Sequence, residues 1–333
     1  MARQIGIDLG TANTLACIKG KGIVLRQPSV VAVNTQNSKV IAVGTDAKEM
    51  VGKTPIDIAA YRPLKDGVIA DFDITKKMLR LFIKHIGGND FIRPEMLICI
   101  PYGITEVERM AAEDAAFNAG ARSVSLIEEP LAAAIGSGLD VLGSRGSMII
   151  DIGGGTTEVA VLSLGGIVVS KSLRAAGDKM DEAIISHVRR KYGVLIGEAS
   201  AEQVKMTVGS VHPEVDRGYI SVIGRNLETG LPATVEVGSM DVEVALEELA
   251  GDLIEAIRKT LVETPPELSG DIYDDGIVLS GGGALLGGLS KLITDATGLR
   301  ARVAESPLDG VIRGIDAVLE NEKEYGSCFV RCK

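Results

Sequence analysis

Aromatic residues and cysteines are scarce in this sequence, and tryptophan is absent. Aromatic side chains make up 3% of the 333 residues, so the core must be packed mainly from aliphatic side chains. The four cysteines match neither a zinc-ligand spacing nor a disulfide scaffold. Reduced thiols, as in a cytosolic protein, are therefore expected. These cysteines are Cys17, Cys99, Cys328 and Cys332.

Long apolar runs and an excess of positive charge are also missing. The sequence has no run of about 18 apolar residues, the length that a membrane helix needs. Its start, MARQIGIDLG, lacks the apolar segment of a signal peptide. We expect an intracellular, soluble protein, with contact to a membrane surface left open. The net charge of −10, from 35 basic and 45 acidic residues, disfavours a nucleic-acid coat. The three histidines are expected on the surface: His85, His187 and His212.

Glycine is abundant instead, with 40 residues, and apolar strands alternate with helical patterns. The chain length suits two domains. EMLICIP has the pattern of a buried strand, and the following segment that of a helix with a capping box at Thr105 and Glu108 and an end at Gly120. Another helix, SAEQVKMTVG, is expected to begin at Ser200. Strands that alternate with helices predict an α/β protein.

The two halves of the chain begin with similar segments. When Asp8 is placed on Asp151, IGIDLGTANT aligns with MIIDIGGGTT. An internal duplication would give two similar domains whose aspartate–glycine turns face each other across a cleft. Chance similarity of two strand–turn units is the alternative.

Both turns have the composition of phosphate-binding loops. Successive backbone N–H groups in a glycine-rich turn bind anions, and a Cβ atom would hold phosphate oxygens away from them. Threonine hydroxyls in the turns, such as that of Thr156, can add donors. Carboxylates repel phosphate but can hold the water ligands of Mg²⁺, so Asp8 and Asp151 together predict a nucleotide–Mg²⁺ complex. A plain hairpin is the alternative for either turn alone.

A third glycine cluster, at 281–283, joins an apolar strand to a helix. A helix N-terminus suits a phosphate or the ribose and base, and a tight β–α turn is the alternative. Two familiar nucleotide motifs are not matched. VGKTP lacks the first glycine of a Walker A loop, because that position is Ala47, and no G-x-G-x-x-G occurs.

Hydrolysis of a bound nucleotide needs a polar side chain that orients a water at the γ-phosphate. Glu128 and Glu129 end the strand SVSLI just before Pro130, beside the expected cleft. Either glutamate is a candidate for this role. An exposed pair of loop residues is the alternative interpretation.

Seven motifs extend over the chain from about residue 3 to 320: GIDLGTANT, PLKDGVIADF, LIEEPLAAAIG, DIGGGTTEVAVLSLG, AGDKMDEAI, TPPELSGDI and LSGGGALLGGL. Together they closely resemble the MreB/Mbl family of bacterial actin homologues. The resemblance implies an α/β, actin-like ATPase fold with two duplicated ribonuclease-H-like domains and a nucleotide cleft between them. Domain I would comprise 1–140 and 310–333, with a small insertion at about 32–65. Domain II would comprise 141–309, with a small insertion at about 180–247.

The resemblance also implies which residues bind ATP and Mg²⁺ in a slow ATPase. Asp8 and Asp151 would bind the metal through water. Glu129, rather than Glu128, would position the attacking water together with Thr156. The nucleotide would be bound by Asp8, Gly10, Thr11, Ala12 and Asn13, by Gly153, Gly154, Gly155 and Thr156, by Glu202, Gln203, Val204 and Lys205, and by Gly281, Gly282, Gly283 and Ala284.

Proteins of this family form paired protofilaments on the inner face of the cytoplasmic membrane and organise cell-wall synthesis in rod-shaped bacteria. The resemblance implies a cytoplasmic, peripheral membrane protein whose partners are itself, the membrane, and cell-elongation and wall-synthesis proteins, without nucleic acid. Few residues precede the first strand, so the N-terminal amphipathic helix of some relatives is expected to be absent. Phe91 and Ile92 match the family's apolar membrane loop, and a buried loop anchor is the alternative.

A small-molecule kinase of the same fold, acting on a sugar or an acid, is the alternative function. A kinase needs a catalytic base and a substrate pocket between the domains. Beyond the shared phosphate loops, the sequence contains no motif for either. The resemblance over the whole chain therefore favours the filament protein.

The tail ENEKEYGSCFVRCK departs from the family's usual ending. Its two cysteines, with apolar and basic neighbours, allow a membrane or lipidation feature. We favour the other interpretation, an unstructured terminus.

Overall fold

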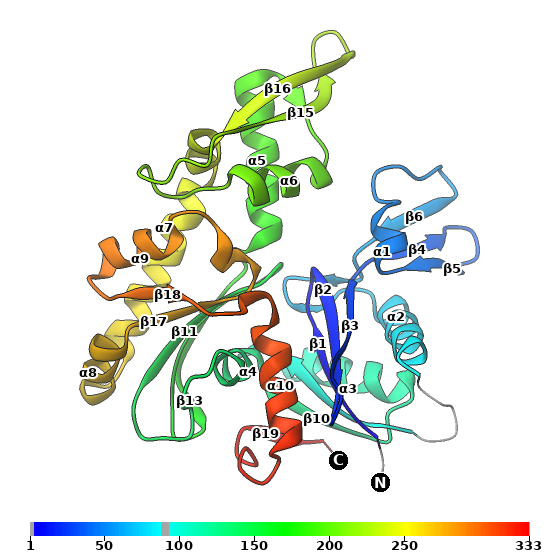
Figure 1. The fold of residues 1–333 in the computed structure, drawn as a ribbon. Helices are drawn as coiled ribbons and strands as arrows, with labels where there is room; N and C mark the ends of the chain where they lie inside the picture. Colours follow the sequence, from blue (N-terminus) through cyan, green and yellow to red (C-terminus); the bar gives the residue numbers. More distant parts are fainter. Residues whose placement is uncertain (1–2, 88–92, 333) are drawn as a thin grey trace.

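Two large β-sheets form the centre of the molecule (Figure 1), and the computed structural model describes residues 3–87 and 93–332. The first sheet has the strand order β19-β10-β9-β1-β2-β3, and the second has the order β13-β12-β11-β17-β18. The first consists of β1 (Gln4–Leu9), β2 (Asn13–Ile18), β3 (Gly22–Pro28), β9 (Glu95–Ile100), β10 (Ser123–Glu128) and β19 (Phe329–Arg331). The second consists of β11 (Ser147–Ile152), β12 (Thr157–Ser163), β13 (Gly166–Leu173), β17 (Ile277–Ser280) and β18 (Ala301–Val303).

The two sheets share one topology, which confirms the predicted duplication. β1 pairs antiparallel with β2 and parallel with β9, just as β11 pairs antiparallel with β12 and parallel with β17. Asp8 is the residue before the last in β1, and Asp151 holds the same position in β11. The two aspartates are therefore equivalent, as the alignment of the two halves predicted.

Helices cover both sheets, and two of them pack between the sheets. α4 (Glu129–Gly136) and α10 (Gly310–Glu320) contact each other in an apolar core to which both sheets contribute. A Cβ atom on Gly136 would overlap the carbonyl oxygen of Gly310, and one on Gly314 would overlap that of Ala132. Only glycine allows this close approach of the two helices.

The remaining helices belong to one domain each. On the first sheet, α2 (Phe72–His85) and α3 (Glu106–Ala119) share a core with β1 and β9. Around the second sheet the chain forms α5 (Gly177–Tyr192), α7 (Ser239–Glu263), α8 (Pro266–Asp275) and α9 (Leu289–Thr297), with the short turns η1 (Gly282–Leu285) and η2 (Pro307–Asp309). Aliphatic side chains dominate these cores, as the lack of aromatic residues required.

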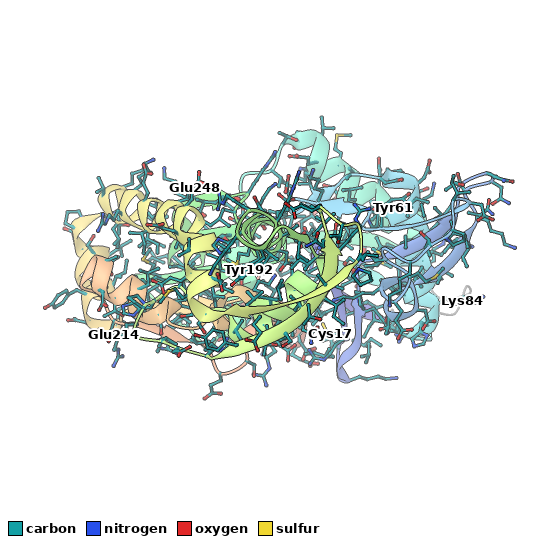
Figure 2. All side chains as sticks on the ribbon, turned by 90° about the horizontal axis from the view of Figure 1, so that it is seen from above. Cys17, Tyr61, Lys84, Tyr192, Glu214 and Glu248 are labelled. Carbon is teal, nitrogen blue, oxygen red and sulfur yellow. The ribbon has the colours of Figure 1, made fainter. Side chains whose placement is uncertain are left out.

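A small sheet stands above each large sheet (Figure 1), within the two predicted insertions. Seen from above in Figure 2, Tyr61 marks the first insertion and Tyr192 the second. The first contains β4 (Val31–Asn34), β5 (Val40–Val43), α1 (Thr45–Lys48) and β6 (Ile58–Tyr61), followed by the hairpin β7 (Leu64–Lys65) and β8 (Val68–Ile69). The second contains β14 (Val194–Leu195), α6 (Glu198–Val208), β15 (Tyr219–Asn226) and β16 (Pro232–Gly238).

The predicted helix boundaries are correct for α3 and wrong for α6. Thr105 and Glu108 form a complete capping box on α3, and Gly120 ends the helix at a φ of 115°. α6, by contrast, begins at Glu198 after Gly197, so Ser200 lies inside the helix instead of capping it. The acidic Glu198 in the first turn is favourable at a helix N-terminus, and this signal outweighed the capping-box pattern.

The C-terminal tail is ordered, so the expectation of an unstructured terminus is wrong. β19 pairs antiparallel with β10, with Phe329 opposite Ile127. The Cys328 side chain is buried, and its Sγ lies 3.7 Å from the carbonyl oxygen of Gly165 in the second domain. The tail is ordered because it covers an unpaired sheet edge and fills apolar space that no local pattern reveals.

Two of the three histidines are buried, which corrects the prediction that they lie on the surface. His187 Nε2 lies 3.0 Å from Asp241, and His212 Nε2 lies 3.1 Å from Asp295. Both pairs connect elements within the second domain, so these histidines are structural. Among the helices of the described ranges, none is long and apolar enough to cross a membrane.

Candidate functional site

A cavity of about 590 Å³ lies between the two domains, a size typical of small-molecule sites. All four predicted nucleotide segments contribute to its wall. Of the predicted site residues, its lining includes Asp8, Gly10, Thr11, Ala12, Asn13, Glu129, Asp151, Gly153, Gly154, Gly155, Thr156, Glu202, Lys205, Gly281, Gly282 and Gly283.

The two aspartate–glycine turns meet across this cavity. A Cβ atom on Gly154 would lie 2.6 Å from the Cβ of Ala12, and one on Gly155 would lie 2.5 Å from the Oγ1 of Thr11. Such distances are far below van der Waals contact, so only glycine fits at either position. The turns therefore approach each other as the duplication predicted.

The second turn leaves backbone donors free. The N–H of Gly153 donates to the carbonyl oxygen of Thr156 at 2.9 Å and closes the turn. Within the described ranges, the N–H groups of Gly154, Gly155 and Thr156 have no hydrogen-bond acceptor. Free N–H groups in a glycine-rich turn beside a cavity form a site for an anion such as phosphate.

Carboxylates from both domains gather at the same cavity. Burial, followed by the charge of Asp151, raises the pKa of Asp8 to about 7. Burial also raises the pKa of Asp151 to about 6. Glu158 does not line the cavity but is fully buried opposite Asp151 in the β11–β12 ladder, and burial raises its pKa to about 7. These acids are stable together only if they are partly protonated or neutralised by a cation.

The carboxylates fit a hydrated divalent cation better than a directly ligated one. In residues 3–87 and 93–332, no three acidic, histidine or cysteine side chains are grouped as a direct metal site. The Oδ1 atom of Asp151 is buried, however, and has no hydrogen-bond partner among the described residues. Because Mg²⁺ retains several water ligands, Asp151 and Asp8 have the right chemistry to accept hydrogen bonds from those waters.

Glu129 lines the cavity, whereas Glu128 does not. Glu128 is the last residue of β10, and Glu129 begins α4 directly before Pro130. Burial, followed by the charges of Asp151 and Asp8, raises the pKa of Glu129 well above its usual range. Thr156, which is 7% exposed, lines the same cavity. An acid and a hydroxyl able to orient a water are thus both present.

Only one face of α6 reaches the cavity. Glu202 and Lys205 line it, and the Lys205 ammonium donates to Gly177 O at 2.8 Å and to Asp181 at 2.9 Å. Gln203 and Val204 do not line the cavity, because each residue turns the helix by about 100°. Gln203 is exposed to solvent, and Val204 is buried in the core of the second domain.

The third glycine loop also lies against the cavity. Gly281 has a φ of 78°, and a Cβ atom on Gly283 would overlap the side chain of Ile152 at the end of β11. Backbone conformation therefore favours glycine at position 281, and close packing requires it at position 283. Ala284 does not line the cavity, because its side chain is turned into the core and is 2% exposed.

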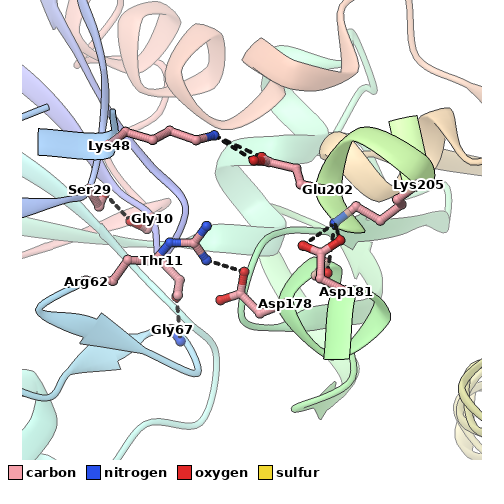
Figure 3. A network of polar contacts seen from close by, with 11 residues as sticks. Gly10, Thr11, Ser29, Lys48, Arg62, Gly67, Asp178, Asp181, Glu202 and Lys205 are labelled. Atoms are coloured by element: carbon pink, nitrogen blue, oxygen red, sulfur yellow. Dashed lines mark hydrogen bonds and ion pairs between the residues drawn. The ribbon is translucent and has the colours of Figure 1, made fainter. Parts of the chain in front are cut away.

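Several lining residues were missed by sequence reasoning. Arg62 comes from the loop after β6, and Asp178 and Asp181 come from the start of α5 (Figure 3). Both aspartates belong to the motif AGDKMDEAI. This motif could have indicated that they line the site. Apolar residues complete the cavity, among them Met180, Met206, Leu285, Leu286, Leu308 and Val311.

Comparison with known proteins gives consistent results over almost the whole chain. The family model described as "MreB/Mbl protein" matches residues 2–327. The chain is 52% identical to the cell shape-determining protein MreB of Escherichia coli K12, covering 98% of this chain and 95% of that protein. It is 49% identical to the cell shape-determining protein Mbl of Bacillus subtilis 168, covering 96% of both.

Solved structures show the same fold. MreB5 of Spiroplasma citri bound to ADP superposes with a TM-score of 0.92 at 36% identity, covering 98% of both chains. The same protein bound to AMPPNP gives 0.92 at 37% identity, covering 97% of this chain and 98% of that one. A MamK double helical filament, at 23% identity, has a TM-score of 0.80 and covers 96% of this chain and 98% of that chain. Its similarity therefore shows only that the fold is actin-like.

Proposed function

Because the chain belongs to the MreB/Mbl family, we propose that it is an ATP-hydrolysing filament protein that organises cell-wall synthesis and rod shape. It is an actin-like cytoskeletal protein and not a sugar kinase. The observation that carries the nucleotide assignment is the pair of equivalent glycine turns that meet at one cavity. We also propose the domain boundaries 1–140 with 310–333, and 141–309.

ATP would lie in the cavity with its phosphates between the two turns. The free N–H groups at 154–156 would donate to phosphate oxygens, and Glu202 and Lys205 would lie nearer the ribose and base. The related MreB5 of Spiroplasma citri has been solved with ADP and with AMPPNP. A nucleoside triphosphate is therefore the class of ligand that we assign to this cavity.

Asp8 and Asp151 would hold Mg²⁺ through its water ligands. The bound cation would neutralise negative charge on the phosphates. Asp151 suits this role because its Oδ1 is buried without a partner in the described chain. With the cation present, both aspartates would be ionised in spite of their raised pKa values.

Glu129 would orient the water that attacks the γ-phosphate, and the hydroxyl of Thr156 would help to position it. The pKa of Glu129 is raised by burial and then by the charges of Asp151 and Asp8. A cation beside these aspartates would cancel their repulsion and let Glu129 ionise, so that its carboxylate could accept a hydrogen bond from the water. The same charge therefore links metal binding to hydrolysis.

Filaments on a membrane would give this ATPase its biological role. The partners that we propose are further copies of the chain, the inner face of the cytoplasmic membrane, and cell-elongation and wall-synthesis proteins. Phe91 and Ile92, the predicted membrane contact, lie outside the described residues. Two apolar side chains bind a membrane weakly, so a filament would have to supply avidity.

Sedimentation of the purified protein tests the filament assignment. The protein is incubated with ATP–Mg²⁺, with ADP–Mg²⁺ or without nucleotide, and pelleted by ultracentrifugation. We expect pelletable filaments that depend on nucleotide, together with slow phosphate release. Monomers in every nucleotide state would contradict the proposal that this chain forms filaments.

Flotation with anionic liposomes tests the membrane assignment. We expect filaments to float with the liposomes and the Phe91→Ser/Ile92→Ser variant to lose most of this binding while still forming filaments. Equal flotation of the variant would remove these residues from the proposed contact.

A further inference from the structure

Two ion pairs connect the two domains at the cavity (Figure 3). Lys48 Nζ lies 2.8 Å from Oε2 and 3.0 Å from Oε1 of Glu202, and the guanidinium of Arg62 pairs with the carboxylate of Asp178. Lys48 ends α1 and Arg62 follows β6, both in the first insertion. Their partners lie at the beginning of α5 and in α6, in the second domain. Each pair therefore joins segments that are more than a hundred residues apart in sequence.

Three of these four residues also line the nucleotide cavity, namely Arg62, Asp178 and Glu202. The pairs therefore belong to the wall of the cavity and not to the open surface of the protein. The side chains are one-quarter to two-fifths exposed, so water reaches the pairs. They bridge the first insertion and the second domain beside the cavity.

The charges on the two sides of the cavity are complementary. The second domain contributes three carboxylates at this place, from Asp178, Asp181 and Glu202. One cation from the same domain, Lys205, pairs with Asp181. Lys48 and Arg62 neutralise the other two from across the cavity. Without them, the uncompensated carboxylates would repel both each other and a nucleoside triphosphate.

We propose that Lys48 and Arg62 form an ionic clamp that closes the two insertions over bound nucleotide and slows its release. This inference rests on the proposed nucleotide site and adds two positioning residues to it. A carboxylate has lone pairs for several donors, so Glu202 can accept from Lys48 and from a ribose hydroxyl together. The clamp acts on the closed state, so its loss raises the dissociation rate more than it lowers the association rate.

The size of the effect follows from the exposure of the pairs. Partly exposed ion pairs each change an equilibrium by about two- to fivefold. Loss of both should therefore speed dissociation by about five- to twentyfold. Salt screens such pairs, so dissociation from the native protein should also become faster as ionic strength rises.

Stopped-flow release of fluorescent AMPPNP, in the presence of Mg²⁺, measures this rate on the full chain. We expect Lys48→Gln/Arg62→Gln to release the nucleotide about five- to twentyfold faster and to lose most of the salt dependence. Lys39→Gln is the matched control, because Lys39 is exposed in the same insertion and forms no ion pair among the described residues. Rates within twofold of the native protein in the double variant would overturn the clamp.

Asp178→Asn separates a clamp from a direct contact between Arg62 and the phosphates. If the pair acts as a clamp, Asp178→Asn speeds release about as much as Arg62→Gln, and combining the two adds little. Unchanged or slower release in Asp178→Asn would overturn the clamp and favour direct phosphate contact. Failure of the native protein to bind the fluorescent nucleotide at all would instead overturn the proposed function, and the clamp with it.

Discussion

Gly154 of the second domain contacts Ala12 of the first across the cavity, so closely that an added Cβ would lie 2.6 Å from the Cβ of Ala12 and 3.0 Å from its backbone nitrogen. The two glycine loops thus leave no room for a side chain at Gly154. The absence of a side chain at Gly154 lets the two loops approach this closely, so the position of each loop depends on the other.

We expect Gly154→Ala to force the two loops apart and to weaken binding of ATP–Mg²⁺ by about tenfold or more. Isothermal titration calorimetry measures the affinity. The control is Gly251→Ala, because a Cβ on Gly251, inside α7, would meet no atom within 4 Å. This control should bind normally and unfold at a slightly higher temperature, since alanine favours a helix interior. Normal affinity in Gly154→Ala would show that the loops adapt to the methyl group.

Glu129→Gln should abolish most turnover and leave nucleotide binding intact. The amide keeps the size of the side chain but is a poor acceptor for the proton of a water, and loss of such a group costs about 10²- to 10⁴-fold in kcat. Phosphate release and nucleotide affinity are measured on the same preparation. Glu128→Gln is the neighbouring control, since Glu128 does not line the cavity. If the two variants hydrolyse ATP equally well, the assignment of Glu129 fails.

Asp8 should make the nucleotide-free protein less stable as pH rises. Burial and then the charge of Asp151 raise its pKa from 3.8 to about 7, so the folded protein binds this proton more tightly than the unfolded chain. The associated stability is full below pH 4 and is lost as pH rises to about 7. A shift of this size corresponds to at most about 4 kcal/mol.

Thermal unfolding of the native protein and of Asp8→Asn, between pH 5 and pH 8, isolates this contribution. We expect the melting temperature of Asp8→Asn to fall less over this range than that of the native protein. ATP–Mg²⁺ should also flatten the native curve, because the cation favours the ionised aspartate. Parallel curves for the two proteins would contradict a raised pKa at Asp8.

The sequence predicted the loops that line the cavity better than it predicted the residues around them. Asp8 and Asp151 were placed correctly because a strand that ends in aspartate and glycine is a local pattern, and the pattern occurs twice. Arg62 and Asp178 were missed, since their pairing depends on how two distant insertions face each other. Gln203 and Val204 were assigned with their neighbours in one motif, although a helix presents only part of a motif to any one side.

The C-terminal tail is a second case in which contacts with distant segments decide the structure. Cys328 and Phe329 stand in a short, mixed sequence without helical or strand periodicity, and nothing local indicates that a sheet edge is free to receive them. The burial of Cys328 and the strand pairing of Phe329 depend on the turn at Gly165 and on β10. The sequence of the tail alone therefore could not predict the contacts with β10 and Gly165 that order it.

Deletion of residues 326–333 should lower the stability of the protein, contrary to what an unstructured terminus would give. The deletion removes β19 from the edge of the first sheet and the buried Cys328 side chain from the core between the sheets. We expect a loss of about 2 kcal/mol, comparable to uncovering one apolar side chain, and a melting temperature lower by several degrees. Val330→Ser is the matched control, because Val330 is 67% exposed on the same strand and its replacement should change little. An unchanged melting temperature after the deletion would mean that β19 adds no stability to the fold.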